Sequence, residues 1–175
     1  YDFPNVEKLS AHIDEIGGLS TALPTAIEPV HSTAFSSSDI AVIGMSLQTP
    51  GAANLDAFWK NLSVRNSGHT LEGKDLFDPS FFGLTDAEAR AMNPHQRLIM
   101  LEGWRAFEDA GLNPWDLAGT RSAIYIGAEP CNWYEGSFTG ASDAIIASRL
   151  SYLLDLKGPA LVINTGCSSS GTAIH

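Results

Sequence analysis

Three short, largely apolar runs, separated by longer segments with helical periodicity, limit most strongly how this chain can fold. They cover residues 40–45, 122–127 and 161–165. Runs of this length that end near glycine are typical of strands buried on both faces. Because these runs alternate with helical patterns along the chain, the sequence predicts an α/β layered fold with a largely parallel sheet.

The segments between these runs carry signals for where helices begin and end. Asn54 is a suitable N-cap, and Thr85 followed by Glu88 matches a capping box. The strongest apolar periodicity ends at Gly111, a residue suited to a helix C-terminus. We therefore expect helices over residues 55–62, 86–91, 95–110 and 142–154, with loops over residues 63–75 and 128–140.

The first 38 residues differ in character from the rest. Residues 1–18 predict a short amphipathic helix, whereas residues 19–38 are rich in proline, serine, threonine and alanine without periodicity, as linkers are. A single helix cannot bury its own apolar face, so we expect residues 1–18 to be the end of a different domain. Globular composition begins at Asp39.

Charge and cysteine content disfavour several classes of function. The chain has 175 residues and a net charge of −10, which disfavours nucleic acid because phosphate binding requires clustered lysine and arginine. No apolar run approaches the roughly 20 residues that a membrane helix needs, and no spacing of cysteine and histidine indicates a metal site. Two cysteines and no secretory signal indicate a reducing, cytoplasmic compartment.

Cys167 stands directly after a predicted strand and at the head of a predicted helix. Backbone N–H groups and the dipole of a helix favour a thiolate there, and the same N–H groups can hold an oxyanion on an attacked thioester. Gly166 and the small residues 168–170 allow a sharp turn and a close-lying acyl chain. The local sequence alone leaves open a buried cysteine that only caps a core helix.

Other side chains that can carry chemistry give weaker signals. Cys131 lies in a predicted loop and is expected to be an incidental thiol. His95 stands at a helix start, where capping or packing is expected rather than catalysis. His175 lies two helical turns beyond Cys167, too far along the same helix to act as its base.

Five ordered segments resemble the ketosynthase domain of modular polyketide synthases. They read DIAVIGM at 39–45, PGAANLDAFWKNL at 50–62, FDPSFFG at 77–83, MNPHQRLIMLEGWRAFEDAG at 92–111 and RLSYLLDLKGPALVINTGCSSS at 149–170. The start of the chain, YDFPNVEKLSAHI, is similar to the last helix of an acyl carrier protein. The resemblance implies a carrier helix at 1–18, a linker at 19–38 and the N-terminal part of a ketosynthase at 39–175.

The resemblance implies a thiolase-like layered α/β/α fold, of which the chain holds the N-terminal half only. It implies Cys167 as the catalytic nucleophile, which accepts an acyl chain from a carrier thioester for decarboxylative Claisen condensation with a malonyl-carrier unit. No cofactor is implied on the chain itself, because phosphopantetheine is carried by partner acyl carrier proteins. Further implied partners are a second copy in a homodimer, other domains of the same megasynthase and an acyltransferase acting in trans.

The chain departs from the family pattern in several places. The common DTACSSS is replaced by NTGCSSS at 164–170, and MDPQQR by MNPHQR at 92–97. Two loops are shorter than usual, at the junctions Gly73–Lys74 and Glu135–Gly136. The sequence leaves open whether the protein itself is shortened there or residues of longer loops are absent from this sequence. The histidine motifs that assist decarboxylation in this family, HGTGT-like and NxGH-like, are absent, so we expect residues 1–175 alone to be inactive in condensation.

Two alternatives to a condensing enzyme stay open. A non-elongating ketosynthase would only pass acyl chains along, and a non-catalytic fragment would only serve carrier docking or dimerisation. A third class, the α/β hydrolases, requires G-x-S-x-G at the turn after the strand, whereas this chain reads G-C-S-S-S-G.

Overall fold

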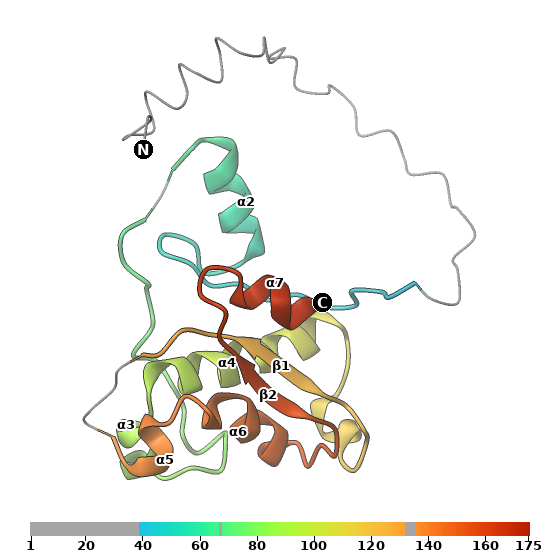
Figure 1. Ribbon diagram of the computed structural model, residues 1–175. Helices are drawn as coiled ribbons and strands as arrows, with labels where there is room; N and C mark the ends of the chain where they lie inside the picture. Colours follow the sequence, from blue (N-terminus) through green and yellow to red (C-terminus); the bar gives the residue numbers. More distant parts are fainter. Residues whose placement is uncertain (1–38, 67, 132–135) are drawn as a thin grey trace. The chain divides into compact units, whose positions relative to one another are not determined.

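Two of the three apolar runs form neighbouring parallel strands in the computed structural model of the protein (Figure 1). Strand β1 is Ile124–Gly127 and strand β2 is Ala160–Ile163, with Ile124 opposite Ala160 and Gly127 opposite Ile163. Both predicted strands are confirmed. The expectation that both faces are buried is wrong for one face, because Tyr125 and Leu161 lie opposite each other there and are each 49% exposed.

The structure describes residues 39–66, 68–131 and 136–175. The predicted carrier helix at 1–18 and linker at 19–38 lie outside the described residues, as does Glu135 of the second predicted junction. The chain from Ala41 to His175 forms one compact unit.

The predicted helices are present, with their caps. Asn54 Oδ1 accepts a hydrogen bond from the backbone N–H of Ala57 at 2.9 Å, and Thr85 and Glu88 form the expected capping box. The helices are α2 (Leu55–Ser63), α3 (Asp86–Ala91), α4 (Pro94–Asp109), the 3-10 helix η1 (Pro114–Leu117), α5 (Phe138–Ala141), α6 (Ile145–Leu153) and α7 (Ser169–Ile174).

One predicted loop contains a helix that the sequence did not indicate. The loop expected over residues 128–140 includes most of α5, whose N-cap is Ser137. The Ser137 hydroxyl accepts the backbone N–H of Gly140 at 3.1 Å, which closes this single turn. The following helix, expected from residue 142, therefore begins later, at Ile145.

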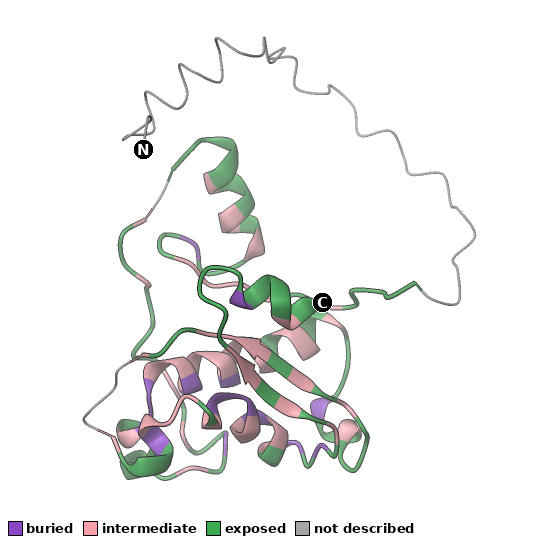
Figure 2. Ribbon diagram, viewed as in Figure 1, coloured by how far each residue is buried: buried purple, intermediate pink, exposed green. Residues whose placement is uncertain are grey.

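The apolar core lies where α4 packs against α6 and where α6 meets the two strands. Met100 of α4 and Leu150 of α6 are almost fully buried, as is Leu154 just after α6. Trp104 and Leu153 contact both groups of buried side chains and join them into a continuous core. Figure 2 shows buried residues gathered on α4 and α6, whereas α7 is mostly exposed. Each such buried side chain contributes about 1.5–3 kcal/mol.

The prediction of a buried strand over residues 40–45 is wrong. The segment forms no strand, and Val42, Ile43 and Met45 are 77%, 66% and 56% exposed. An apolar strand is stable when neighbours cover both faces and satisfy its backbone, and within the described residues this segment has no pairing strand.

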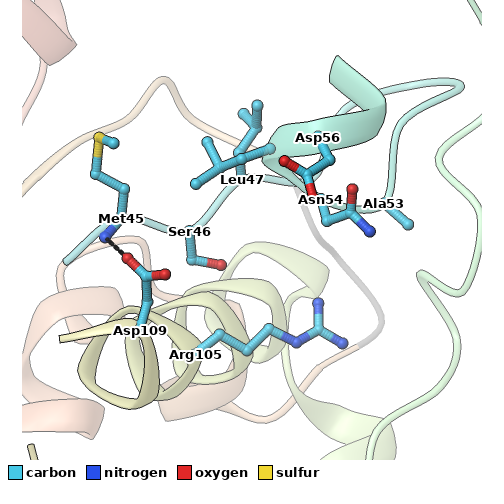
Figure 3. A pocket seen from close by; sticks show the side chains of 9 residues that line it. Met45, Ser46, Leu47, Ala53, Asn54, Asp56, Arg105 and Asp109 are labelled. Carbon is cyan, nitrogen blue, oxygen red and sulfur yellow. Dashed lines mark hydrogen bonds between the residues drawn. The ribbon is translucent and has the colours of Figure 1, made fainter. Parts of the chain in front are cut away.

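Hydrogen bonds to side chains of α4 fix the C-terminal end of this segment instead. The backbone N–H of Met45 donates to Asp109 Oδ2 at 2.8 Å, and the Ser46 hydroxyl donates to Glu102. Figure 3 shows Met45 and Ser46 lying over Asp109 and Arg105 of α4, with Asn54 and Asp56 of the α2 start beside them. These residues line a surface pocket of about 390 Å³.

Candidate functional site

Cys167 lies in the turn that connects β2 to α7. Strand β2 ends at Ile163 and α7 begins at Ser169, so the predicted strand–turn–helix junction is confirmed. The thiol is free and the residue is exposed. The alternative of a buried cysteine that caps a core helix is therefore wrong, and Ser168 occupies the N-cap position.

The turn over residues 164–170, called here the Cys167 turn, is bent at Gly166. This glycine has a φ of 66°, a left-handed conformation that a side chain would strain. Its backbone N–H donates to Asn164 Oδ1 at 3.0 Å, which fixes the entry into the turn. A glycine at this position therefore avoids strain at the residue before the thiol.

Ser169 forms side-chain hydrogen bonds with the backbone at the start of the Cys167 turn. It is only 5% exposed, and its hydroxyl accepts the backbone N–H of Thr165 at 2.9 Å and donates to the carbonyl of Gly166 at 2.7 Å. Its own backbone N–H donates to the same Gly166 carbonyl at 3.0 Å. The hydroxyl therefore ties the chain before Cys167 to the chain after it.

Further hydroxyl groups reinforce the turn on its exposed side. The Ser168 hydroxyl donates to the carbonyl of Thr165 at 2.9 Å and lies 2.9 Å from Thr165 Oγ1. Thr172 Oγ1 donates to the carbonyl of Ser168 at 3.0 Å and lies 3.1 Å from Thr165 Oγ1. From the sequence, these serines were expected only to be small enough for a sharp turn. The density of serine and threonine around Cys167 was the signal for such side-chain-to-backbone bonds.

The Cys167 turn rests directly on the end of β1. A Cβ atom added to Gly127 would come within 2.5 Å of Ser169 C and of Ser170 N, closer than real Cβ atoms come. A glycine at this position of β1 therefore allows the backbone of α7 to approach the sheet. Helix α7 contacts both strands, so the position of Cys167 depends on the sheet as well as on the turn.

An apolar surface pocket includes Gly127 in its lining but no residue of the Cys167 turn. It has a volume of about 250 Å³ and is lined by the α4 start, by the residues that end and follow β1, and by Ile146 of α6. Gly127 belongs to its lining and also touches the backbone of the Cys167 turn. The lining residues are His95, Leu98, Ile99, Ile126, Gly127, Ala128, Glu129 and Ile146.

Cys131 differs from Cys167 in its surroundings. It is partly buried, and this burial, together with the charge of Asp143, raises the pKa of its thiol, while a hydrogen bond with the Asn93 side chain acts in the opposite direction. Since the thiolate is the nucleophilic form, these surroundings make Cys131 less reactive at neutral pH. The structure does not bring the two cysteines into one hydrogen-bonded group.

His95 lies at the start of α4, and His175 directly follows α7. The backbone N–H of His95 donates to Asn93 Oδ1 at 2.8 Å, so Asn93 is the cap of α4. His95 Nδ1 is buried and has no hydrogen-bond partner among the residues that the structure describes. His175 follows α7, and its backbone N–H donates to the carbonyl of Gly171 at 3.1 Å. Among the described residues, no three histidine, cysteine or acidic side chains gather as a metal site would require, and no helix there is long and apolar enough to span a membrane.

The sequence matches known proteins over the whole described region. Residues 37–72 and 63–175 match the beta-ketoacyl synthase N-terminal domain. The chain is 37% identical over 163 residues to polyketide synthase ThaG of Burkholderia thailandensis, covering 78% of this chain and 3% of that protein. It is 41% identical over 139 residues to the highly reducing polyketide synthase dmxL2 of Cryptosporiopsis sp., covering 69% of this chain and 6% of that protein.

The fold is similar to that of solved ketosynthases. The ketosynthase from module 6 of the bacillaene synthase of Bacillus subtilis 168 superposes with a TM-score of 0.69 at 38% identity, covering 77% of this chain and 28% of that chain. The oxazolomycin ketosynthase domain OzmH KS8 of Streptomyces albus JA3453 gives 0.62 at 39% identity, covering 77% and 34%. The chain therefore spans a small part of its relatives, with the thiolase-like α/β fold expected from its sequence. On this evidence the chain belongs to the beta-ketoacyl synthase family, as part of a polyketide synthase ketosynthase domain.

Proposed function

We propose that the protein is a β-ketoacyl synthase in which Cys167 accepts an acyl chain from a carrier thioester. The observation that carries this proposal is the exposed, free thiol at a sharply bent turn between β2 and α7. Membership of the ketosynthase family supports the same reaction. Accessibility matters because the thioester sits at the end of a long prosthetic arm that must reach the sulfur.

The first step is an acyl transfer. The Cys167 thiolate attacks the carbonyl carbon of the acyl thioester, and a tetrahedral oxyanion forms. Collapse of that intermediate breaks the bond to the sulfur of the carrier's phosphopantetheine, which leaves as a thiol after taking up a proton, while the acyl group stays on Cys167.

The second step forms the carbon–carbon bond. Decarboxylation of a malonyl unit on a second carrier gives a carbanion, which attacks the acyl carbonyl on Cys167 and releases the thiolate and a β-ketoacyl thioester. The proposed partners are acyl carrier proteins with phosphopantetheine arms, a second copy of the chain, other domains of the megasynthase and an acyltransferase acting in trans. Within the chain, residues 1–18 are proposed as a carrier helix, 19–38 as a linker and 39–175 as the ketosynthase part.

The test uses the full-length protein with an acyl-loaded carrier and a malonyl-loaded carrier. We expect a β-ketoacyl thioester by mass spectrometry from the wild type and from Cys131→Ala, the matched control, and none from Cys167→Ala. Full product formation by Cys167→Ala contradicts the proposal. Acylation of Cys167 without any new carbon–carbon bond identifies a non-elongating, transacylating ketosynthase instead.

A further inference from the structure

We propose that the Ser169 hydroxyl is a positioning group for acyl transfer to Cys167. This inference rests on the proposed role of Cys167 as the acyl acceptor. The hydroxyl joins the two ends of the five-residue segment from Thr165 to Ser169, and Cys167 is the central residue of that segment. It accepts the Thr165 N–H at 2.9 Å and donates to the Gly166 carbonyl at 2.7 Å.

Both hydrogen bonds are partly buried, because they join the buried Ser169 to the exposed Thr165 and Gly166. Ser169 is 5% exposed, whereas its neighbours Ser168 and Ser170 are exposed. A buried hydroxyl that both donates and accepts keeps the same two partners, because bulk water competes little for its hydrogen bonds. Of the three consecutive serines, Ser169 is the buried one, so its hydrogen bonds should restrain the backbone beside the thiol more firmly than the exposed bonds of Ser168.

The turn needs such a restraint. Gly166, the residue before the thiol, has the widest choice of backbone conformation of any residue type, and its φ of 66° is one of several it can adopt. Without the Ser169 hydroxyl, the Thr165 N–H loses its partner and the bend at Gly166 is held by fewer bonds. The Cys167 sulfur and the backbone groups around it then sample several positions.

Loss of a fixed position affects two reactions of the thiol differently. Acyl transfer requires the sulfur, the carbonyl carbon and the groups that stabilise the oxyanion to be held together, and a misplacement of about 1 Å can cost on the order of a hundredfold in rate. Alkylation by iodoacetamide forms no oxyanion and needs only an accessible thiolate. A positioning role therefore lowers the acylation rate without lowering the alkylation rate equally.

The experiment compares Ser169→Ala with Ser170→Ala in the full-length protein. Ser170 is the matched control because its side chain is exposed and makes no hydrogen bond in the described part of the chain. Acylation of Cys167 by a short acyl thioester and alkylation by iodoacetamide are followed by mass spectrometry. For Ser169→Ala we expect acylation to fall at least about tenfold and alkylation to change less than about threefold; Ser170→Ala should match the wild type in both.

Ser169→Thr, which keeps the hydroxyl, serves as the conservative variant. We expect it to retain most of the acylation rate, and circular dichroism and thermal unfolding establish that each variant is folded. Unchanged acylation in Ser169→Ala, an equal fall in both rates, or a folded Ser169→Thr as slow as Ser169→Ala overturns the inference. A wild-type protein that is alkylated but never acylated at Cys167 refutes the proposed function instead.

Discussion

Gln96 and Ser169 are both buried polar side chains that bind backbone groups, but they bridge very different lengths of chain. Gln96 in α4 is 0% exposed, and its Nε2 donates to the carbonyls of Thr139, Gly140 and Ser142 at 3.0–3.1 Å. Ser169 binds residues only three and four positions before it. One side chain joins distant segments, and the other shapes a single turn.

Because of this difference, we expect Gln96 to affect the stability of the protein and Ser169 to affect the shape of the Cys167 turn. Gln96 also accepts a hydrogen bond from Arg149 Nε in α6, so it connects α4, α5 and α6 and contributes to the stability of the whole unit. Burial of Arg149 lowers the pKa of its guanidinium, with Glu88 acting in the opposite direction, but the group stays charged because its ordinary pKa is so high. Ser169 instead contributes to the shape of the Cys167 turn, and hence to chemistry.

The largest effect is expected for Gln96→Ala. It removes the amide's hydrogen bonds to the carbonyls of Thr139, Gly140 and Ser142 and the acceptor of Arg149 Nε, and we expect the free energy of unfolding to fall by about 3 kcal/mol. Below its melting temperature, the variant should still be acylated at Cys167. Chemical denaturation measures the free energy of unfolding. Gln48→Ala is the matched control, because Gln48 is only partly buried and its amide donates to the Glu72 carbonyl in an exposed hydrogen bond. Equal stability of the two variants contradicts the proposed role of Gln96.

Gly127→Ala should give the next largest effect, and it acts on both properties. The added Cβ would lie 2.5 Å from Ser169 C, so the Cys167 turn must move away from β1. We expect a loss of about 2 kcal/mol from overpacking and slower acylation of Cys167. Gly171→Ala in α7 is the control, because nothing lies within 4 Å of its added Cβ. If both variants behave alike, contact with β1 does not position the turn.

Ser168→Ala should have a smaller effect than either. Its hydroxyl binds Thr165 on the exposed side of the turn, where water can replace the lost bonds. We expect a loss of about 0.5 kcal/mol in stability and an acylation rate closer to wild type than that of Ser169→Ala. If Ser168→Ala is acylated more slowly than Ser169→Ala, then Ser168 and not Ser169 is the serine that positions the Cys167 turn.

The smallest effect concerns acid pH and lies in α3. Hydrogen bonds from the Thr85 backbone N–H and hydroxyl lower the pKa of Glu88 below its ordinary value, and the charge of Arg149 acts in the same direction. A carboxyl whose pKa is depressed by folding stabilises the protein above its unfolded pKa, and this contribution is lost as the pH falls through the folded pKa. The melting temperature should therefore decrease slightly below about pH 4.

Glu88→Gln separates this contribution from that of other acids. The variant should show a shallower decrease of melting temperature on acidification than the wild type, because the amide does not titrate. Asp78, whose pKa is lowered mainly by the Ser80 hydroxyl and also by the Phe81 and Ser80 N–H groups, should keep its own share of the acid dependence. An identical pH dependence in wild type and Glu88→Gln argues against the capping box as a pH-dependent contact.

Local signals predicted the helices and the Cys167 turn from the sequence. The caps at Asn54 and Thr85 and the junction at Cys167 depend on residues within a few positions of one another, and a pattern can contain all of them. The sequence also predicted strands β1 and β2. In the structure each strand pairs with the other, so the strand composition of both segments is matched by a neighbour.

Features that depend on distant partners were predicted poorly. The run at 40–45 has the composition of a strand, but composition does not say which strand pairs with it, and in the described structure its apolar side chains are exposed. The bonds of Gln96 across more than 40 residues left no local pattern either. The role of Ser169 was missed for a different reason: three consecutive serines look alike, and only burial distinguishes the middle one.

Peptide mapping of acyl adducts in the full-length protein shows directly which cysteine accepts the acyl chain. The protein is incubated with one equivalent of a short acyl thioester at neutral pH, digested, and analysed for acylated cysteine. We predict the adduct on the exposed Cys167, with Cys131 unmodified because partial burial raises the pKa of its thiol. An adduct on Cys131, or a Cys167 that stays unmodified while the thioester is consumed, contradicts the assignment of Cys167 as the acyl acceptor.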